Sequence, residues 1–261
     1  MAKVRLIPKL LLKESSHGSK KPVLVITRRY NEIIEIGSPV SMAKIFQAQG
    51  ADELIFTNIR PETIPYYELR KIINAISEEI FMPVTVGGGI FSVEQFRELL
   101  TDGADKISIN TAAIKNPALI TEASLKFGAQ CVVVSIDYKK DEEGKCFVYT
   151  NGGTVKTNYS PEEWAVEAEK FGAGEILLTS MDNDGMRNGM DNYMNKIVCE
   201  AVSIPVIVSG GCSLPQHFID AVIDGKADAV AAGTFFAFKD QSFMQVRSHI
   251  RNAGIDIRVY T

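Results

Sequence analysis

Gly50-Ala-Asp-Glu-Leu-Ile-Phe-Thr-Asn-Ile59 returns later in the chain as Gly172-Ala-Gly-Glu-Ile-Leu-Leu-Thr-Ser-Met181. Two further pairs of segments recur at the same spacing, the second with one inserted residue: Pro83-Val-Thr-Val-Gly-Gly-Gly89 with Pro205-Val-Ile-Val-Ser-Gly-Gly211, and the run from Gly103 with the run from Gly225. Repeated segments in register are the signature of an internal duplication. The sequence therefore predicts two homologous halves, which we place at about residues 1–125 and 126–261.

Short apolar runs rich in β-branched residues predict four buried strands in each half. They lie at residues 4–11, 53–59, 84–88, 106–110, 131–137, 175–180, 206–210 and 228–233. Apolar residues at spacings of three and four predict helices between them, at residues 40–49, 66–80, 93–100, 117–127, 161–171, 193–202, 214–223 and 242–252. This alternation indicates an α/β fold, a (β/α)8 TIM barrel built from two homologous half-barrels, with residues 1–261 as a single domain. A doubly wound open sheet is the alternative, but two equal halves close more naturally than they extend.

Composition excludes several classes of protein. A net charge of −4 gives no electrostatic reason to expect nucleic acid as a partner. The four cysteines show no Cys-x-x-Cys spacing, so we expect free thiols instead of disulfides or zinc. Asp182 and Asp184 stand close together, but no histidine joins them, and no metal is expected. No signal peptide or membrane-spanning segment is visible, so we expect a cytoplasmic protein that uses no cofactor and no membrane.

Two connections between predicted strands and helices exceed the usual two to six residues. Residues 13–38 follow the first strand and predict a mobile flap. Residues 138–160 follow the fifth strand and contain Cys146-Phe-Val-Tyr-Thr150, which predicts a small hairpin. Plain surface insertions are the alternative for both. Because the carboxyl ends of barrel strands carry the chemistry in this fold, both connections border the expected site.

Glycine and small polar residues gather where the predicted strands end. Glycine lets backbone N–H groups approach an anion closely, and the loops after the seventh and eighth strands of such a barrel commonly hold phosphate. The third and fourth strands repeat this composition, which predicts two facing phosphate cradles and a ligand phosphorylated at both ends. Tight turns alone are the alternative interpretation. With the turn after the sixth strand, the expected anion-binding residues are Gly88, Gly89, Asn110, Thr111, Asp184, Gly185, Ser209, Gly210, Gly211, Gly233 and Thr234.

Charged residues mark both ends of the predicted strands. Asp137 ends the fifth strand, where a carboxylate serves either as an acid/base group or to hold a loop. At the opposite ends, four strands begin with or next to Arg5, Glu53, Lys106 and Glu175. These residues could pair as a ring that closes the barrel, because unpaired charges there are costly to bury. On the residues alone, separately solvated strand starts are the better interpretation.

Together these segments resemble the cyclase subunit of imidazole glycerol phosphate synthase, an enzyme of histidine biosynthesis, over nearly the whole chain. The resemblance is carried by Thr85-Val-Gly-Gly-Gly-Ile90, Gly103-Ala-Asp-Lys-Ile-Ser-Ile-Asn-Thr-Ala-Ala113, Val134-Ser-Ile-Asp-Tyr-Lys139, Gly172-Ala-Gly-Glu-Ile-Leu-Leu-Thr-Ser180 and Ser209-Gly-Gly211.

That resemblance implies a function and roles for particular residues. In the family, a duplicated half-barrel binds a bis-phosphorylated substrate, and ammonia from a glutaminase docked on the N-terminal face crosses the barrel past a salt-bridged gate. The resemblance assigns the gate to Arg5, Glu53, Lys106 and Glu175, which reverses the interpretation from the residues alone. It also places Asp105 in the glutaminase interface, and a phosphorylated small molecule or inorganic phosphate in the cradles.

The chain departs from the family at the end of the first strand. The family's cyclase (lyase) chemistry uses two aspartates, at the ends of strands one and five. Asp137 matches the second, whereas Leu11 stands at the first, and an apolar side chain cannot transfer protons. Asn58 replaces an aspartate at the end of strand two, and the flap lacks the family's Lys-Asp-Gly start. We therefore expect Asp137 to be the surviving member of a catalytic pair and the cyclase activity to be lost.

A retained conduit without the cyclase pair resembles the paralogous branch in which a cyclase-like subunit and its glutaminase serve an N-acetyl-sugar amidotransferase for surface polysaccharides. The leading hypothesis is a barrel subunit of a glutamine amidotransferase, with the glutaminase at its N-terminal face and the sugar amidotransferase at its C-terminal face. Two alternatives stay open. One is a genuine cyclase, with Asp137 as acid/base group and a flap residue in place of the lost aspartate. The other is a non-catalytic scaffold that activates the glutaminase.

Overall fold

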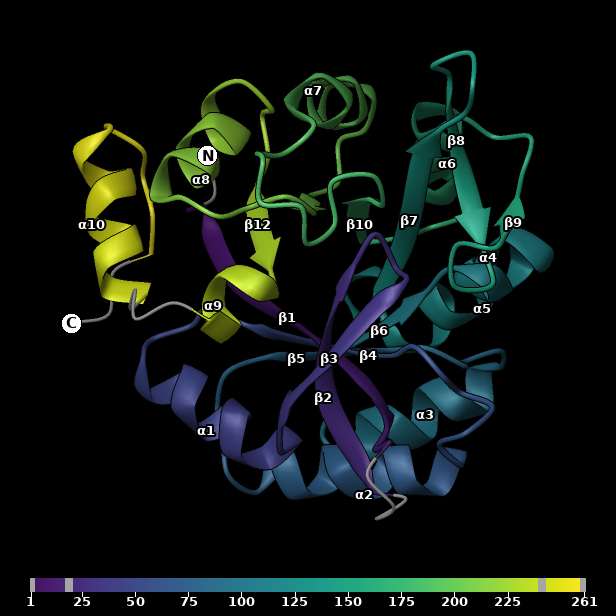
Figure 1. Ribbon diagram of the computed structural model, residues 1–261. Helices are drawn as coiled ribbons and strands as arrows, with labels where there is room; N and C mark the ends of the chain where they lie inside the picture. Colours follow the sequence, from purple (N-terminus) through teal and green to yellow (C-terminus); the bar gives the residue numbers. More distant parts are fainter. Residues whose placement is uncertain (1–2, 17–20, 239–242, 259–261) are drawn as a thin grey trace.

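Parallel strands follow one another around a closed ring (Figure 1). The computed structural model describes residues 3–16, 21–238 and 243–258, and within them eight parallel strands form the barrel. In order around the ring they are β1 (Arg5–Glu14), β4 (Leu54–Asn58), β5 (Val84–Gly87), β6 (Lys106–Ile109), β7 (Val132–Lys140), β10 (Glu175–Ser180), β11 (Val206–Ser209) and β12 (Ala229–Ala232). Strand β12 pairs again with β1, which closes the ring. The predicted (β/α)8 barrel is therefore confirmed.

Helices cover the outside of the barrel in the connections between its strands (Figure 1). Those that match predicted segments are α1 (Pro39–Ala48), α2 (Tyr66–Ser77), α3 (Val93–Thr101), α5 (Ala118–Phe127), α6 (Pro161–Lys170), α7 (Asn192–Ala201), α8 (Pro215–Ile223) and α10 (Phe243–Asn252). The short elements α4 (Thr111–Lys115), η1 (Ala129–Cys131) and α9 (Thr234–Phe238) were not predicted, because they are too short to show a helical period. None of the helices in the described part of the chain combines the length and hydropathy needed to cross a membrane.

Helix α6 illustrates how the sequence sets the position of these helices. Ser160 Oγ accepts a hydrogen bond from Glu163 N, and the Glu163 carboxylate accepts one from Ser160 N, which is a capping box at the helix start. Within the helix, Trp164, Ala165 and Ala168 are buried. Since these apolar residues recur at spacings of three and four, the helix packs one face on the barrel and leaves its charged face in solvent.

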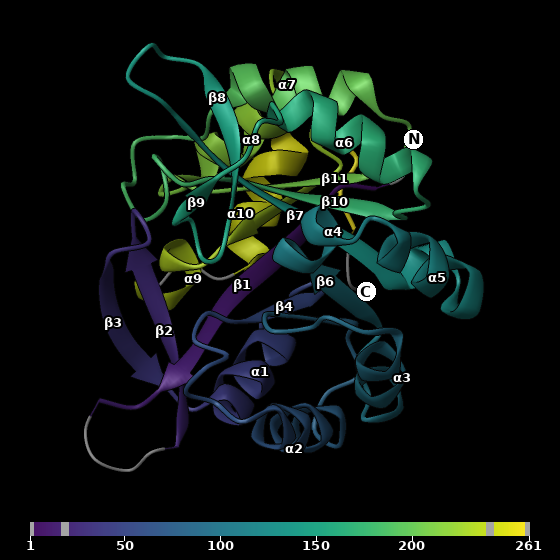
Figure 2. The same cartoon turned by 90° about the vertical axis from the view of Figure 1, so that its right-hand side faces the viewer.

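Strands β1 and β7 continue beyond the barrel, and each turns back as an antiparallel hairpin on the side where the barrel strands end (Figure 2). Strand β2 (Pro22–Arg28) pairs with β1 and β3 (Glu32–Gly37), while β8 (Cys146–Thr150) pairs with β7 and β9 (Val155–Lys156). The hairpin predicted after the fifth strand is confirmed. The mobile flap predicted over residues 13–38 is corrected: its described residues form strands, because alternating β-branched runs there support pairing.

Strand pairing repeats between the two halves of the barrel. Leu11 on β1 lies opposite Thr57 on β4, and Asp137 on β7 lies opposite Thr179 on β10. Thr57 and Thr179 occupy equivalent positions of the sequence repeat. Leu11 and Asp137 also each lie opposite a residue of the following hairpin. The two side chains therefore stand at equivalent places at the mouth of the barrel.

Candidate functional site

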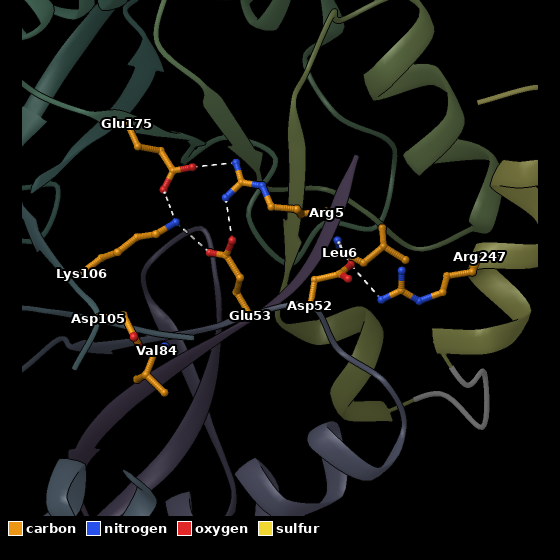
Figure 3. A network of polar contacts seen from close by, with 9 residues as sticks. All are labelled: Arg5, Leu6, Asp52, Glu53, Val84, Asp105, Lys106, Glu175 and Arg247. Carbon is orange, nitrogen blue, oxygen red and sulfur yellow. Dashed lines mark hydrogen bonds and ion pairs between the residues drawn. The ribbon is translucent and has the colours of Figure 1, made fainter. Parts of the chain in front are cut away.

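Four charged side chains form a closed ring of ion pairs where the barrel strands begin (Figure 3). Arg5 Nη1 lies 2.8 Å from Glu53 Oε1, and Arg5 Nη2 lies 2.6 Å from Glu175 Oε1. Lys106 Nζ lies 2.9 Å from Glu53 Oε2 and 2.8 Å from Glu175 Oε2. Each cation thus donates to both carboxylates. The structure brings together the four residues predicted for the gate, and they are not separately solvated strand starts.

Burial of this ring makes its pairing essential. Glu53 and Glu175 are only 5% and 4% exposed. Burial raises the pKa of Glu53, but the charges of Arg5 and Lys106 outweigh burial and leave it below its usual value. Burial lowers the pKa of Arg5, and the charges of Glu175 and Glu53 reverse this and raise it. Removing one member of the ring would therefore leave a buried charge without compensation.

Two more carboxylates hold the strand starts beside the ring (Figure 3). Asp52 Oδ2 accepts a hydrogen bond from Leu6 N at 2.8 Å and lies 2.7 Å from Arg247 Nη2, in a buried ion pair that the sequence did not reveal. Asp105, the residue predicted for a partner interface, is exposed at this face of the barrel. Its Oδ2 accepts a hydrogen bond from Val84 N at 2.8 Å, so the side chain also holds the start of β5.

Beyond the ring, the interior of the barrel (the lumen) is lined by apolar side chains. Because side chains alternate along a strand, residues two positions after the ring residues point inward one layer further on. A buried apolar cluster makes up most of the lining here, and its members are Ile7, Ile55, Val133, Leu177, Ile207, Ala229 and Ala231. On β6 the residue two positions after Lys106 is Ser108, which adds a hydroxyl group. The layer separates the charged ring from the polar end of the lumen.

Hydroxyl groups and one lysine follow the apolar layer. The same alternation brings inward a set of small polar residues, which are Thr57, Ser108, Ser135, Thr179 and Ser209. Lys9 points into the lumen from β1, and its Nζ donates a hydrogen bond to Thr179 Oγ1 at 2.9 Å. Sequence reasoning did not single out Lys9, although the period-two run Arg5, Ile7, Lys9 places it on the inward face.

Asp137 lies at the mouth and contacts two side chains from other elements. Its Oδ1 accepts a hydrogen bond from the Tyr30 hydroxyl at 2.9 Å, and its Oδ2 accepts one from Asn110 Nδ2 at 2.9 Å. Tyr30 comes from the turn between β2 and β3, where Arg29 and Tyr30 both have positive φ angles of 49° and 63°. Residues with side chains rarely adopt this conformation. Burial and the charges of Asp137 and Asp184 raise the pKa of Tyr30 well above its usual value, so the phenol stays protonated and donates.

Leu11 lines the same mouth at the position equivalent to Asp137. Its side chain borders the cavity there, as does Asp137. An isobutyl group neither accepts nor donates a proton, so the two equivalent strand ends carry one carboxylate between them. The structure therefore places Leu11 where the sequence predicted the loss of an acid/base group.

A cavity of about 660 Å³ opens at the mouth. It is lined by the whole predicted anion-binding set: Gly88, Gly89, Asn110, Thr111, Asp184, Gly185, Ser209, Gly210, Gly211, Gly233 and Thr234. Gly88 and Gly210 have φ angles of 93° and 103°, and a Cβ there would lie 2.0 Å from Asn58 O and 2.6 Å from Ser180 O. These pairs are equivalent in the repeat, so the two cradles share one construction.

The side chains of two residues in that set form hydrogen bonds with other side chains of the protein. Asp184 Oδ2 accepts a hydrogen bond from Thr27 Oγ1 at 2.5 Å, and burial raises the pKa of Asp184 despite that bond. Asn110 is bonded to Asp137. Their side chains therefore organise the mouth, which leaves backbone groups and hydroxyls for an anion. Within the described ranges, no group of three or more His, Cys, Asp or Glu side chains is placed to hold a metal ion.

Known proteins match this chain over most of its length. The model of the family described as "Histidine biosynthesis protein" matches residues 17–241. The chain belongs to this family. A Prochlorococcus marinus member named "Putative imidazole glycerol phosphate synthase subunit hisF2" is 46% identical over 260 residues, 99% of each chain. Members named "Imidazole glycerol phosphate synthase subunit HisF" from Geobacillus kaustophilus and Bacillus licheniformis are 44% and 43% identical over 231 residues, 88% of this chain and 92% of theirs.

The chain is thus a HisF-like member of the histidine biosynthesis protein family, and the predicted resemblance is confirmed at that level. Motif reasoning missed two residues of this HisF-like site, Lys9 and Tyr30. Lys9 stands outside the glycine-rich and acidic motifs. Tyr30 lies in a turn without glycine, so neither its positive φ angle nor its contact with Asp137 has a local signal in the sequence.

Proposed function

We propose that this HisF-like chain is the synthase subunit of a glutamine amidotransferase. In this proposal a glutaminase binds at the ring end, and ammonia crosses the lumen to an N-acetyl-sugar amidotransferase at the mouth, in the biosynthesis of surface polysaccharides. One observation carries the proposal. The ring of Arg5, Glu53, Lys106 and Glu175 is complete, whereas the position on β1 that is equivalent to Asp137 holds the apolar Leu11. The complete ring supports a conduit, and Leu11 in place of a carboxylate argues against the acid/base pair.

The ring end has the features of a docking face. Phe81 lies three residues before β5 and is 94% exposed, and Asp105 is exposed at the same end of the barrel. Exposed aromatic residues with a polar surround are typical of protein interfaces. The relatives are named as subunits of a synthase, which agrees with a partner at this face. We therefore place the glutaminase here.

The lumen between ring and mouth suits a small neutral molecule. Its apolar layer offers nothing to an ion, because transfer of an unpaired charge into such surroundings is very unfavourable. Ammonia is uncharged and small, and the hydroxyl groups beyond the layer can exchange hydrogen bonds with it. The ring has two cations and two carboxylates, so as a whole it presents no net charge at the entrance.

The mouth supports delivery of ammonia better than cyclase chemistry. Asp137 is bonded to Tyr30 and Asn110, and its equivalent on β1 is Leu11. A paralogous role agrees with the similarity to the relative named hisF2. The second candidate, a genuine cyclase, is favoured by the cavity and its duplicated glycine cradles, and by the similarity to relatives named HisF. Both candidates keep phosphate or a phosphorylated small molecule in the cradles.

A turnover assay separates the two candidates. The purified chain is incubated with the cyclase substrate of imidazole glycerol phosphate synthase and ammonium chloride, which removes the need for a glutaminase. The HisF protein of Geobacillus kaustophilus serves as the positive control. We expect turnover at least about 100-fold below the control, the lower limit for loss of one acid/base group. Turnover close to the control would establish the cyclase and overturn the proposal.

A coupling assay tests the conduit itself. The chain is combined with its glutaminase and sugar amidotransferase, and the aminated product formed per glutamine hydrolysed is measured. We expect Arg5→Ala and Lys106→Ala to lower this ratio several-fold, because each breaks the ring. Arg97→Ala, which removes an exposed pair with Glu94 on α3, is the control and should leave the ratio unchanged. An unchanged ratio in both ring variants would favour a scaffold that only activates the glutaminase.

A further inference from the structure

Lys9 crosses the lumen from one side of the barrel to the other. Its backbone lies on β1, and its Nζ donates to Thr179 Oγ1 on β10. Around the ring of strands, β11 and β12 separate β10 from β1 on the shorter side. The hydrogen bond therefore spans the interior, and any molecule that moves from the apolar layer to the mouth passes the Lys9 side chain.

Lys9 is not paired with carboxylates as closely as the ring cations are, although its charge counteracts the burial that raises the pKa of Asp184, a residue of the same cavity. Arg5 and Lys106 each have two carboxylate partners, all within 2.9 Å. Among the described residues, Lys9 has no carboxylate within ion-pair distance, and the partner identified for its Nζ is a hydroxyl group. Its aliphatic stem follows directly after Ile7 in the inward row, so the charge stands at the border between the apolar layer and the hydroxyl groups.

We propose that Lys9 makes the mouth end of the lumen a charge filter, which passes neutral ammonia and excludes ammonium and other small cations. This inference rests on the proposed conduit and adds a selectivity that the ring alone does not provide. The ring carries no net charge, whereas the half-buried Lys9 places one positive charge at the border between the apolar layer and the mouth, below the carboxylates of Asp137 and Asp184 that line the mouth. A cation a few ångströms away is strongly repelled there, while an uncharged molecule is not.

Neutral ammonia can pass because the bond that holds Lys9 across the lumen is a single hydrogen bond. Lysine has four rotatable bonds in its stem, so Nζ can leave Thr179 and return without a change in the backbone. Ammonia accepts one hydrogen bond and donates three, so it can replace Thr179 as the partner of Lys9 for a moment. Ammonium offers no lone pair, and its charge adds repulsion. Solvent ammonium, sodium and potassium at the mouth are excluded in the same way.

The filter can be tested on the chain alone with thallium(I), a cation close to ammonium in size that is located by anomalous scattering. Crystals of the wild type, Lys9→Ser and Lys9→Arg are soaked in a series of thallium(I) acetate concentrations. Serine is the residue that the second half carries at the equivalent position, Ser135, so it introduces a neutral group already compatible with the lumen. Arginine keeps the charge. Lys13→Ser on the same strand is the matched control, because Lys13 pairs with Glu35 on β3.

We expect thallium among the hydroxyl groups of Lys9→Ser at a concentration at least roughly tenfold below any that fills the wild-type lumen. Lys9→Arg and Lys13→Ser should leave the lumen as empty of thallium as the wild type. Thallium in the wild-type lumen, or none in that of Lys9→Ser, would overturn the filter. Thermal unfolding of each variant shows that it is folded. The conduit can fail independently, since only the ring variants in the coupling assay test it.

Discussion

The two halves of the barrel place equivalent backbone positions at the same level of the lumen but fill them with different side chains. Strand registers define three equivalent pairs, which are Lys9 with Ser135, Leu11 with Asp137, and Lys106 with Ala229. The same spacing in the sequence pairs Arg5 with Cys131, the last residue of η1 before β7. The first half supplies the three basic residues of this set, and the second half supplies the carboxylate at the mouth. The ring carboxylates Glu53 and Glu175 are the same in both halves, as are Thr57 and Thr179.

This difference follows from the space inside a closed barrel. Long cationic side chains that reach across the lumen need small residues on the far side, and cysteine, serine and alanine provide that room. A duplicated backbone therefore does not require duplicated chemistry. The first half can line the lumen with basic side chains, while the second half supplies small residues that leave room for them and a carboxylate at the mouth. Variants that exchange residues between equivalent positions test this division directly.

The largest effect is expected when the mouth is made symmetrical. Leu11→Asp gives β1 the carboxylate that β7 already has, and it should raise cyclase turnover with ammonium chloride by about 100-fold, the lower end for an added acid/base group. The gain is limited because Tyr30 occupies one oxygen of Asp137. Initial rates of the variant and the wild type measure this gain in turnover. Leu12→Asp is not suitable as a control, because Leu12 is buried. Asp137→Asn in the Leu11→Asp background should abolish the gain.

Unchanged turnover in Leu11→Asp, with the substrate shown to bind, would mean that the two strand ends are not functionally equivalent. The flap would then be the feature that separates this chain from a cyclase.

Breaking the ring should show the next largest effect, and only from the first half. Arg5→Met leaves two buried carboxylates with one cation, and we expect the free energy of unfolding to fall by about 3–5 kcal/mol. Cys131→Ala changes the equivalent position of the second half, and about 1 kcal/mol or less is expected there. Urea unfolding at neutral pH measures both. Equal losses in the free energy of unfolding would show that the two positions contribute equally to stability. That result would contradict the division of charge between the halves.

Removing the phenol hydroxyl should have a smaller effect. Tyr30→Phe takes one hydrogen bond from the charged Asp137, and such bonds contribute about 1.5–3 kcal/mol. Tyr159→Phe is the control, because that ring lies on the outside against Trp164, and a change below about 0.5 kcal/mol is expected. Urea unfolding again gives the values. A loss in Tyr30→Phe no larger than in the control would mean that the hairpin does not stabilise the mouth.

The sequence predicted the parts of this molecule that depend on local patterns. Buried strands, amphipathic helices and glycine turns follow from spacing and composition, and the repeat indicated a closed barrel. Leu11 was found because the family resemblance places an aspartate at the end of the first strand, where this sequence has leucine. The ring was different, since its four residues are far apart in sequence and only barrel closure brings their side chains within 2.9 Å.

The β2–β3 hairpin and the inward position of Lys9 were not predicted, and the physical reasons are of the same kind. The turn at Arg29 and Tyr30 adopts positive φ angles without glycine, so the usual hairpin signal is absent. Tertiary contacts of Tyr30 with Asp137 and of Arg29 N with Asp184 O hold that conformation in place. Lys9 faces the lumen by alternation alone, and its partner Thr179 comes from the other half. Contacts between halves are what local patterns cannot supply.

The smallest expected effect is the titration of Tyr30, which, like Asn110, reaches from the first half to the carboxylate of Asp137 in the second. Burial and the charges of Asp137 and Asp184 raise its pKa in the folded protein above the value of about 10 for an unfolded chain. A raised pKa means that the stabilisation is fully present below about pH 10 and is lost as pH rises through the folded value. Difference absorbance of tyrosinate between the wild type and Tyr30→Phe should therefore show one phenol that ionises only at higher pH. If Tyr30 instead ionised near pH 10, its hydroxyl would be in solvent, and only Asn110 would join the first half to Asp137 at the mouth.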